Sequence, residues 1–142
     1  MPSFTTQIPN LRVRGPVMSI QIAIDTMTEE SLRLQGDSVP TPVSVMAMVD
    51  PGATQTIIRE DLVQRLNLKP LSALLVTTPV STEVECYQFP VRLFLFPEVA
   101  FECAAIAASL QYQDIQCLIG RDILQHGIFI YLGHNESFTL SF

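Results

Sequence analysis

Apolar and polar residues alternate along much of the chain, and this pattern predicts a β protein. Over residues 18–25, a methionine and three isoleucines occupy every second position, as in a strand that buries one face. Further short strands are expected where apolar or β-branched runs are bounded by turn residues: 43–49, 54–58, 89–96, 100–108 and 117–120, with a closing hairpin over 129–132 and 138–142. Many short strands with few helices indicate a small, mostly antiparallel β barrel or sandwich.

Two segments change to a helical period. Over residues 59–68, Leu62, Val63 and Leu66 recur at helical spacing, and Pro70 ends the element. A second short helix is expected over 121–126, stopped at Gly127.

The other segments predict extended chain, a loop and a hairpin. Residues 1–15 are expected to form an extended N-terminal segment. Residues 26–42 are polar and predict a long surface loop with one short helical turn near 29–34. Residues 74–87 contain two extended arms around a polar tip, which predicts a hairpin.

The composition limits the partners of the chain. The 142 residues suit one domain, 1–142; 48% of them are hydrophobic and 15% charged, against about a quarter charged in an average soluble domain. This indicates a large core or apolar surface covered by another subunit. A net charge of −6 and a single lysine leave no basic surface for nucleic acid. Charged residues and prolines interrupt the longest apolar stretch, 89–110, so no membrane span is expected.

Three cysteines, Cys86, Cys103 and Cys117, are widely spaced without a CxxC pair, so no zinc site is expected. Their spacing fits buried thiols in a reducing compartment. The first 16 residues lack the apolar run of a signal peptide, and we expect a cytoplasmic protein. A bridge between Cys86 and Cys103 on neighbouring strands is an open alternative.

An acidic turn is the strongest candidate for chemistry. The apolar run 45–49 ends abruptly at Asp50-Pro51-Gly52. A carboxylate at the end of a buried strand is costly without a partner, and Gly52 allows a backbone shape or a close approach that a Cβ would block. The same three residues also form ordinary turns, so this segment alone leaves both interpretations open. A second buried strand likewise ends at Gly120 before a short helix, which would place two such turns side by side.

Together, the two motifs resemble those of the retropepsins, the retroviral-type aspartic proteases, in their bacterial and cellular single-domain form. In that family a hydrophobic strand runs into Asp-Thr/Ser-Gly-Ala, which corresponds here to residues 48–53. Further along, two hydrophobic residues and a glycine precede a short helix, which corresponds here to residues 118–124. The resemblance implies an all-β fold: a small, closed acid-protease barrel with one or two short helices that forms a homodimer.

The resemblance also implies the roles of particular residues. Each subunit supplies one catalytic aspartate, Asp50, and the pair activates a water that hydrolyses a peptide or protein substrate without a metal or cofactor. The terminal segments interleave in an intersubunit sheet. The implied site residues form an active-site loop, a flap-like hairpin tip and a second glycine turn: Pro51, Gly52, Ala53 and Thr54; Thr77, Thr78, Pro79, Val80, Ser81 and Thr82; Leu118, Ile119, Gly120, Arg121 and Asp122.

Two positions depart from the family pattern. Pro51 replaces a Thr or Ser whose hydroxyl binds across the dimer axis, and Thr54 replaces an acid that often pairs with the arginine at Arg121. Arg121 therefore needs another partner: Asp122, Glu60 or a backbone carbonyl. Three interpretations follow: an active aspartic endopeptidase, a pseudo-protease kept as a dimerisation or peptide-binding module, and an unrelated small β domain.

Overall fold

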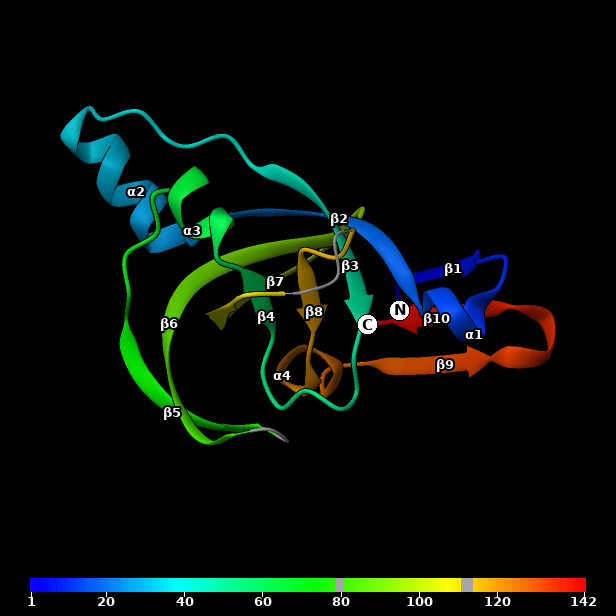
Figure 1. Ribbon diagram of the computed structural model, residues 1–142. Coiled ribbons are helices and arrows are strands. Elements are labelled where there is room, and N and C mark those ends of the chain that lie inside the picture. Colours follow the sequence, from blue (N-terminus) through cyan, green and yellow to red (C-terminus); the bar gives the residue numbers. More distant parts are fainter. Residues whose placement is uncertain (79–80, 111–113) are drawn as a thin grey trace.

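Six strands close into a barrel around the hydrophobic core (Figure 1). The computed structural model describes residues 1–78, 81–110 and 114–142, without the side chains of 72–78 and 81–85. Within this part of the chain, the order around the barrel is β2 (Val17–Ile24), β3 (Val43–Val49), β8 (Cys117–Ile119), β4 (Ile57–Arg59), β7 (Val99–Ala108) and β6 (Ser81–Phe96). β6 pairs back with β2 and closes the ring. The predicted closed, mostly β barrel is confirmed.

Two parallel strand pairs decide where the turns meet. β3 runs parallel to β8, with Val49 beside Ile119, and β4 runs parallel to β7. The other pairings in the barrel are antiparallel. Because parallel strands end at the same edge of a sheet, the residues after Val49 and after Ile119 emerge together.

The barrel interior is filled by the apolar positions of the strands. In β2 the buried side chains include Ile20, Ile22 and Ile24, while Ser19 and Gln21 face outward, as the period of two predicts. The side chains of Val91 and Leu93 are fully buried. Each large apolar side chain removed from water contributes about 1.5–3 kcal/mol, so this core holds the strands that carry the two turns.

The interpretation of residues 26–42 as a surface loop with one helical turn is wrong for the first part of the segment, because α2 (Thr26–Gln35) is a helix of ten residues, whereas residues 37–42 form the expected loop. Asp25 caps it by accepting from the N–H of Thr28 at 3.2 Å, and Gly36 ends it in the left-handed conformation. None of its residues is buried, and the apolar Leu34 is 89% exposed. The helix therefore lacks the apolar face by which a sequence pattern reveals a helix.

The N-terminal segment is also more structured than the expected extended chain over 1–15. It contains β1 (Ser3–Gln7) and a four-residue helix, α1 (Leu11–Arg14), whose Leu11 is buried. With α3 (Asp61–Arg65) and α4 (Arg121–Leu124), the described residues include four α-helices rather than one or two. α3 and α4 lie within the two segments predicted to be helical, 59–68 and 121–126, whereas α1 and the length of α2 were not predicted.

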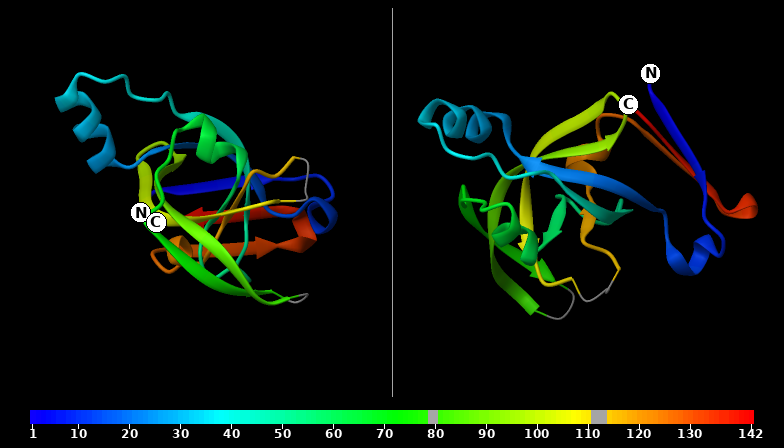
Figure 2. Two further views of the ribbon diagram at one scale, coloured as in Figure 1. Left: turned by 60° about the vertical axis from the view of Figure 1, so that its left-hand side comes forward. Right: turned by 90° about the horizontal axis from the view of Figure 1, so that it is seen from above.

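A three-stranded sheet joins the two ends of the chain. It has the order β1, β10 (Ser137–Ser141), β9 (Ile128–Leu132), and a short 3-10 helix (Gly133–Asn135) connects β9 to β10. The termini lie side by side (Figure 2). Both edges of β10 are paired within the same chain, with β1 on one side and β9 on the other. An intersubunit sheet that interleaves through β10, as expected from the resemblance, would require one of these pairings to break.

A hairpin extends from the barrel, as the pattern over 74–87 predicts. β5 (Ser72–Thr78) pairs antiparallel with the first half of β6, and Thr78 lies opposite Ser81. Thr77 and Thr82 belong to the same two strands, and Pro79 and Val80, which the sequence pattern assigns to the tip, lie outside the described residues. Among the described helices, none is long and apolar enough to span a membrane.

Candidate active site

Asp50 begins a tight turn directly after β3. Its N–H donates to the carbonyl of Ile119 at 2.9 Å, and its carbonyl accepts from the N–H of Ala53 at 3.1 Å. The carboxylate Oδ1 accepts from the N–H of Gly52 at 3.0 Å. A Cβ on Gly52 would lie 3.1 Å from that oxygen, and its φ is not positive. The close approach to the carboxylate, rather than a left-handed backbone, is therefore what favours glycine here.

The second glycine turn packs against the first, as the two motifs predicted. Gly120 follows β8, and a Cβ added to it would lie 2.5 Å from the backbone carbon of Gln55 and 2.8 Å from the nitrogen of Thr56. The N–H of Arg121 donates to the carbonyl of Ala53 at 2.9 Å. Two backbone turns this close leave no room for a side chain, so the glycine is required by packing.

A buried polar network that the sequence did not indicate joins the two turns. Thr56 is fully buried, and its hydroxyl donates to Oδ1 of Asp122 at 2.8 Å while it accepts from the N–H of Gly120 at 3.2 Å. The same carboxylate oxygen accepts from the N–H of Ile123 at 3.0 Å, at the start of α4. Asp122 thus stabilises the second turn from beneath. A threonine before two isoleucines gives no sequence signal for this role.

Of the three partners expected for Arg121, a backbone carbonyl is the one that its side chain binds. One terminal nitrogen donates to the carbonyl of Pro51 at 2.7 Å, and the other donates to the hydroxyl of Thr54 at 3.1 Å. Neither Asp122 nor Glu60 forms an ion pair with it among the described residues. The arginine therefore holds the turn that contains Asp50.

Comparison with known proteins identifies this arrangement. A model of the family described as "Aspartyl protease" matches residues 31–123, a segment that contains both glycine turns. The chain belongs to the aspartyl protease family. The retropepsin-like character expected from the two motifs is confirmed.

A solved structure agrees with this aspartyl protease assignment at the level of the fold. The retropepsin-like aspartic protease from Rickettsia conorii is similar over 98% of this chain and 90% of its own, with a TM-score of 0.53 and 14% identity. The retroviral protease-like domain of Ddi1 from Leishmania major has 15% identity over 89% of each chain, with a TM-score of 0.46. None of the curated proteins compared matches the sequence.

The base of the hairpin contacts the segment that follows the Asp50 turn. The side-chain amide of Gln88 in β6 donates to the side-chain oxygen of Gln55 at 3.2 Å, and its backbone carbonyl accepts from the N–H of Leu71 at 2.8 Å. The hairpin is thus connected at its base to the segment that follows Asp50.

Cys86, Cys103 and Cys117 are free thiols, which excludes the bridge between Cys86 and Cys103. Burial raises the pKa of Cys103 to about 12, with a smaller contribution from the nearby Asp122 carboxylate, and burial also raises the pKa of Cys117. A thiol that stays protonated is a poor nucleophile and a poor metal ligand. The described residues contain no group of three or more His, Cys, Asp or Glu side chains that could hold a metal ion.

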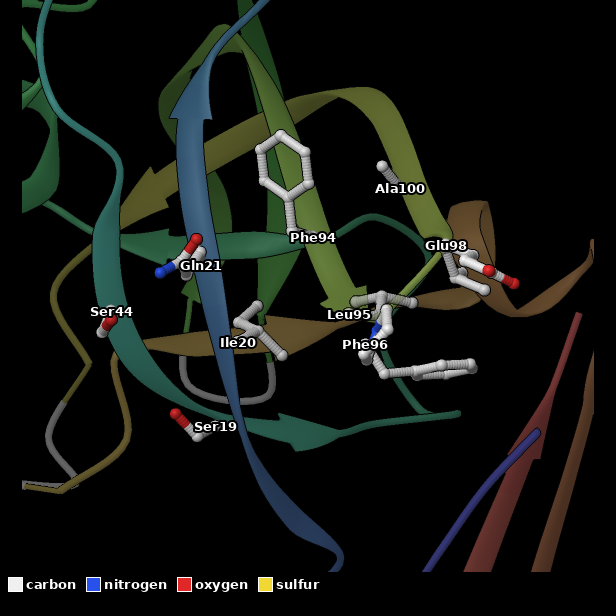
Figure 3. A pocket seen from close by; sticks show the side chains of 11 residues that line it. Ser19, Ile20, Gln21, Ser44, Phe94, Leu95, Phe96, Glu98 and Ala100 are labelled. Carbon is white, nitrogen blue, oxygen red and sulfur yellow. The ribbon is translucent and has the colours of Figure 1, made fainter. Parts of the chain in front are cut away.

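A cavity of about 640 Å³ lies apart from both turns, where the β6–β7 hairpin diverges from β2 (Figure 3). β2 pairs with β6 as far as Gln21 opposite Phe94, and the pairing of β6 with β7 is irregular between Phe94 and Phe96. The ring of Phe96 stacks on Phe4 of β1 at 5.8 Å between centroids. No residue of the two glycine turns lines this cavity.

Proposed function

We propose that the chain is an aspartic endopeptidase that hydrolyses peptide bonds with the Asp50 carboxylates of two subunits. The observation that supports this most is the position of Asp50 in a chain of the aspartyl protease family. Its carboxylate accepts from the N–H of Gly52, in a turn packed directly on the second glycine turn. Asp50 is half-buried, which leaves the carboxylate within reach of a substrate.

The chemistry needs two carboxylates. In aspartic proteases the two lie about 3 Å apart and share one proton, because like charges at that distance cannot both ionise. The ionised carboxylate takes a proton from a water, whose oxygen attacks the carbonyl carbon of the substrate, while the other carboxyl protonates the carbonyl oxygen. The tetrahedral carbon then loses the amine, which takes the proton held by the first carboxyl as the C–N bond breaks, while a hydroxyl on that carbon returns a proton to the second carboxylate. One chain supplies a single Asp50, so we propose a homodimer as the active form.

The surface of β9 supports this dimer. Its side chains Ile128, Ile130 and Tyr131 are between 44% and 49% exposed, and β9 is an outer strand of the terminal sheet. An exposed apolar edge strand favours association with another chain. β9 also begins soon after α4, whose first residue, Arg121, contacts the Asp50 turn. A dimer formed along β9 leaves every pairing of β10 intact.

Pro51 favours a second candidate, a pseudo-protease that dimerises or binds peptides without efficient hydrolysis. Proline has no hydroxyl to bind across the dimer axis, so two Asp50 turns are held together by fewer contacts than in relatives with Thr or Ser. The flap role of the hairpin at 74–87 belongs to both candidates, because it concerns peptide binding.

Cleavage of a quenched fluorescent peptide library tests the proposed function. Asp50→Asn should lower kcat/KM by a factor of about 10²–10⁴ or more, because a carboxylate that moves protons is lost. Asp37→Asn, which removes an exposed carboxylate elsewhere, should change it less than twofold. Sedimentation should show a dimer for the wild type and for both variants, and a pepsin-type transition-state mimic should inhibit the wild type.

Cleavage that persists in Asp50→Asn would refute the catalytic role. Absence of cleavage in the wild type, with a large gain in Pro51→Thr, would favour the pseudo-protease. A chain that cleaves peptides as a monomer would refute the two-carboxylate mechanism.

A further inference from the structure

Arg121 contacts the Asp50 turn at three places within one chain. Its backbone N–H donates to the carbonyl of Ala53 at 2.9 Å, and its guanidinium donates to the carbonyl of Pro51 at 2.7 Å and to the hydroxyl of Thr54 at 3.1 Å. A distance of 2.7 Å is typical of a hydrogen bond strengthened by charge.

The Pro51–Gly52 peptide group accepts a hydrogen bond from Arg121 and donates one to the carboxylate of Asp50. The carbonyl of Pro51 and the N–H of Gly52 belong to one planar peptide group, and no described peptide bond is cis. In a trans peptide the C=O and N–H point in opposite directions. Arg121 therefore holds one side of this plane while the other side donates to Oδ1 of Asp50 at 3.0 Å.

We propose that Arg121 is the positioning residue for the Asp50 carboxylate, and that it acts through the Pro51–Gly52 peptide. This inference rests on the proposed function for its kinetic consequence. Proline fixes φ at position 51 but leaves ψ free, and ψ sets the direction of this peptide plane. The bond from Arg121 removes that freedom from within the same subunit. The Thr or Ser hydroxyl that the family has at position 51 acts instead across the dimer axis.

The guanidinium has the geometry for this role. Its two terminal nitrogens bind two acceptors on the same loop, the Pro51 carbonyl and the Thr54 hydroxyl, as a rigid planar fork can. It pairs with no carboxylate among the described residues, so its charge polarises the peptide rather than an acid. A bond to the carbonyl oxygen strengthens the opposite N–H as a donor.

Steady-state kinetics of Arg121 variants test the inference. Arg121→Gln should lower kcat by about 10–100-fold with KM changed less than about threefold, because a charge-assisted bond is lost from the turn and not from the substrate. Arg121→Lys, which can retain one of the two side-chain bonds, should lie between. Arg65→Gln, a matched removal of an exposed guanidinium on α3, should leave kcat unchanged. In a Pro51→Thr background the penalty of Arg121→Gln should fall several-fold, because a hydroxyl then holds the turn.

Hydrogen exchange of the Gly52 amide gives a readout that does not depend on activity. Arg121→Gln should speed its exchange at least several-fold, while the amide of Asp50, which donates to Ile119, should be unaffected. If Arg121→Gln speeds Gly52 exchange while the wild type cleaves no peptide, the proposed function is refuted and the positioning role is supported.

Two results would overturn the positioning role. One is unchanged Gly52 exchange and kcat in Arg121→Gln while Asp50→Asn is inactive. The other is a variant whose only change is a lower melting temperature, with normal kcat for each folded active site.

Discussion

Gly120→Ala should destabilise the protein by about 2–4 kcal/mol, although alanine suits the local backbone. Gly120 has φ of −89° and ψ of −176°, an extended conformation open to any residue. The cost comes from packing alone. The added Cβ would lie 2.5 Å and 2.6 Å from the carbon and oxygen of Gln55, and 2.8 Å from the nitrogen of Thr56.

The size of this loss of stability follows from the distance by which the two turns would have to move apart. Ordinary contact begins at 3.4 Å, so the two backbones must move apart by up to 0.9 Å (3.4 − 2.5). Overpacking of this kind costs about 1–3 kcal/mol. The same movement weakens the hydrogen bonds from Arg121 to Ala53 and from Gly120 to Thr56, now 2.9 and 3.2 Å. Each contributes about 1 kcal/mol, and losing about half of each adds about 1 kcal/mol to the cost.

Thermal and urea denaturation at one fixed protein concentration measure this effect. Fixed concentration matters because the stability of the proposed dimer would depend on the protein concentration. For a domain of this size, 1 kcal/mol corresponds to about 3–4 °C, so the melting temperature should fall by roughly 6–16 °C. Gly133→Ala is the matched control, because its Cβ would meet only the side chain of Tyr131, at 3.3 Å, and should cost less than about 1 kcal/mol. An equal loss in the two variants would refute the close packing of the turns.

Two further predictions concern the buried groups beneath the turns. Thr56→Val should cost about 1–3 kcal/mol in urea denaturation because Asp122 loses a buried donor, and Thr56→Ser should cost clearly less; equal costs would contradict the network. At pH 8, iodoacetamide should alkylate Cys86 first and reach Cys103 and Cys117 only through unfolding, because burial raises both of their pKa values. The unfolded thiols ionise near pH 8.5, so the stability that these two thiols contribute should be complete below that pH and decline as the pH rises above it; a flat profile between pH 8 and 11 would contradict this.

The parts of the fold that the sequence predicts are those with a strong apolar period. The strand before Asp50 and the strand before Gly120 are short apolar runs that end in turn residues, and the barrel places them side by side. The sequence pattern does not predict α2, because its apolar residues do not form one buried face: Met27, for example, is 80% exposed. Its only signals are the capping residues Asp25 and Gly36 at its ends. Capping residues without an apolar face predict a loop as readily as a helix.

The contacts within the site were harder to predict than its location. The motif places Arg121 near the Asp50 turn. Whether its side chain binds a carboxylate or a carbonyl depends on which of them it can reach in the folded barrel. Thr56 is similar, because a buried hydroxyl and an exposed one look alike in a sequence. Its partner Asp122 is 66 positions away. Contacts of this kind depend on tertiary packing, which local patterns do not encode.

The geometry of the turn also changes the meaning of Pro51. The described hydrogen bonds of the turn use the N–H groups of Asp50, Gly52 and Ala53 and the carbonyl of residue 51. None of them needs an N–H at position 51, which is the group that proline lacks. Proline therefore removes the family hydroxyl without removing a bond from the turn itself. In relatives with Thr or Ser, the hydroxyl at this position holds the turn from across the dimer axis. Here, on the proposed role of Arg121, the turn is held from within the same subunit, through the Pro51–Gly52 peptide that donates to the Asp50 carboxylate.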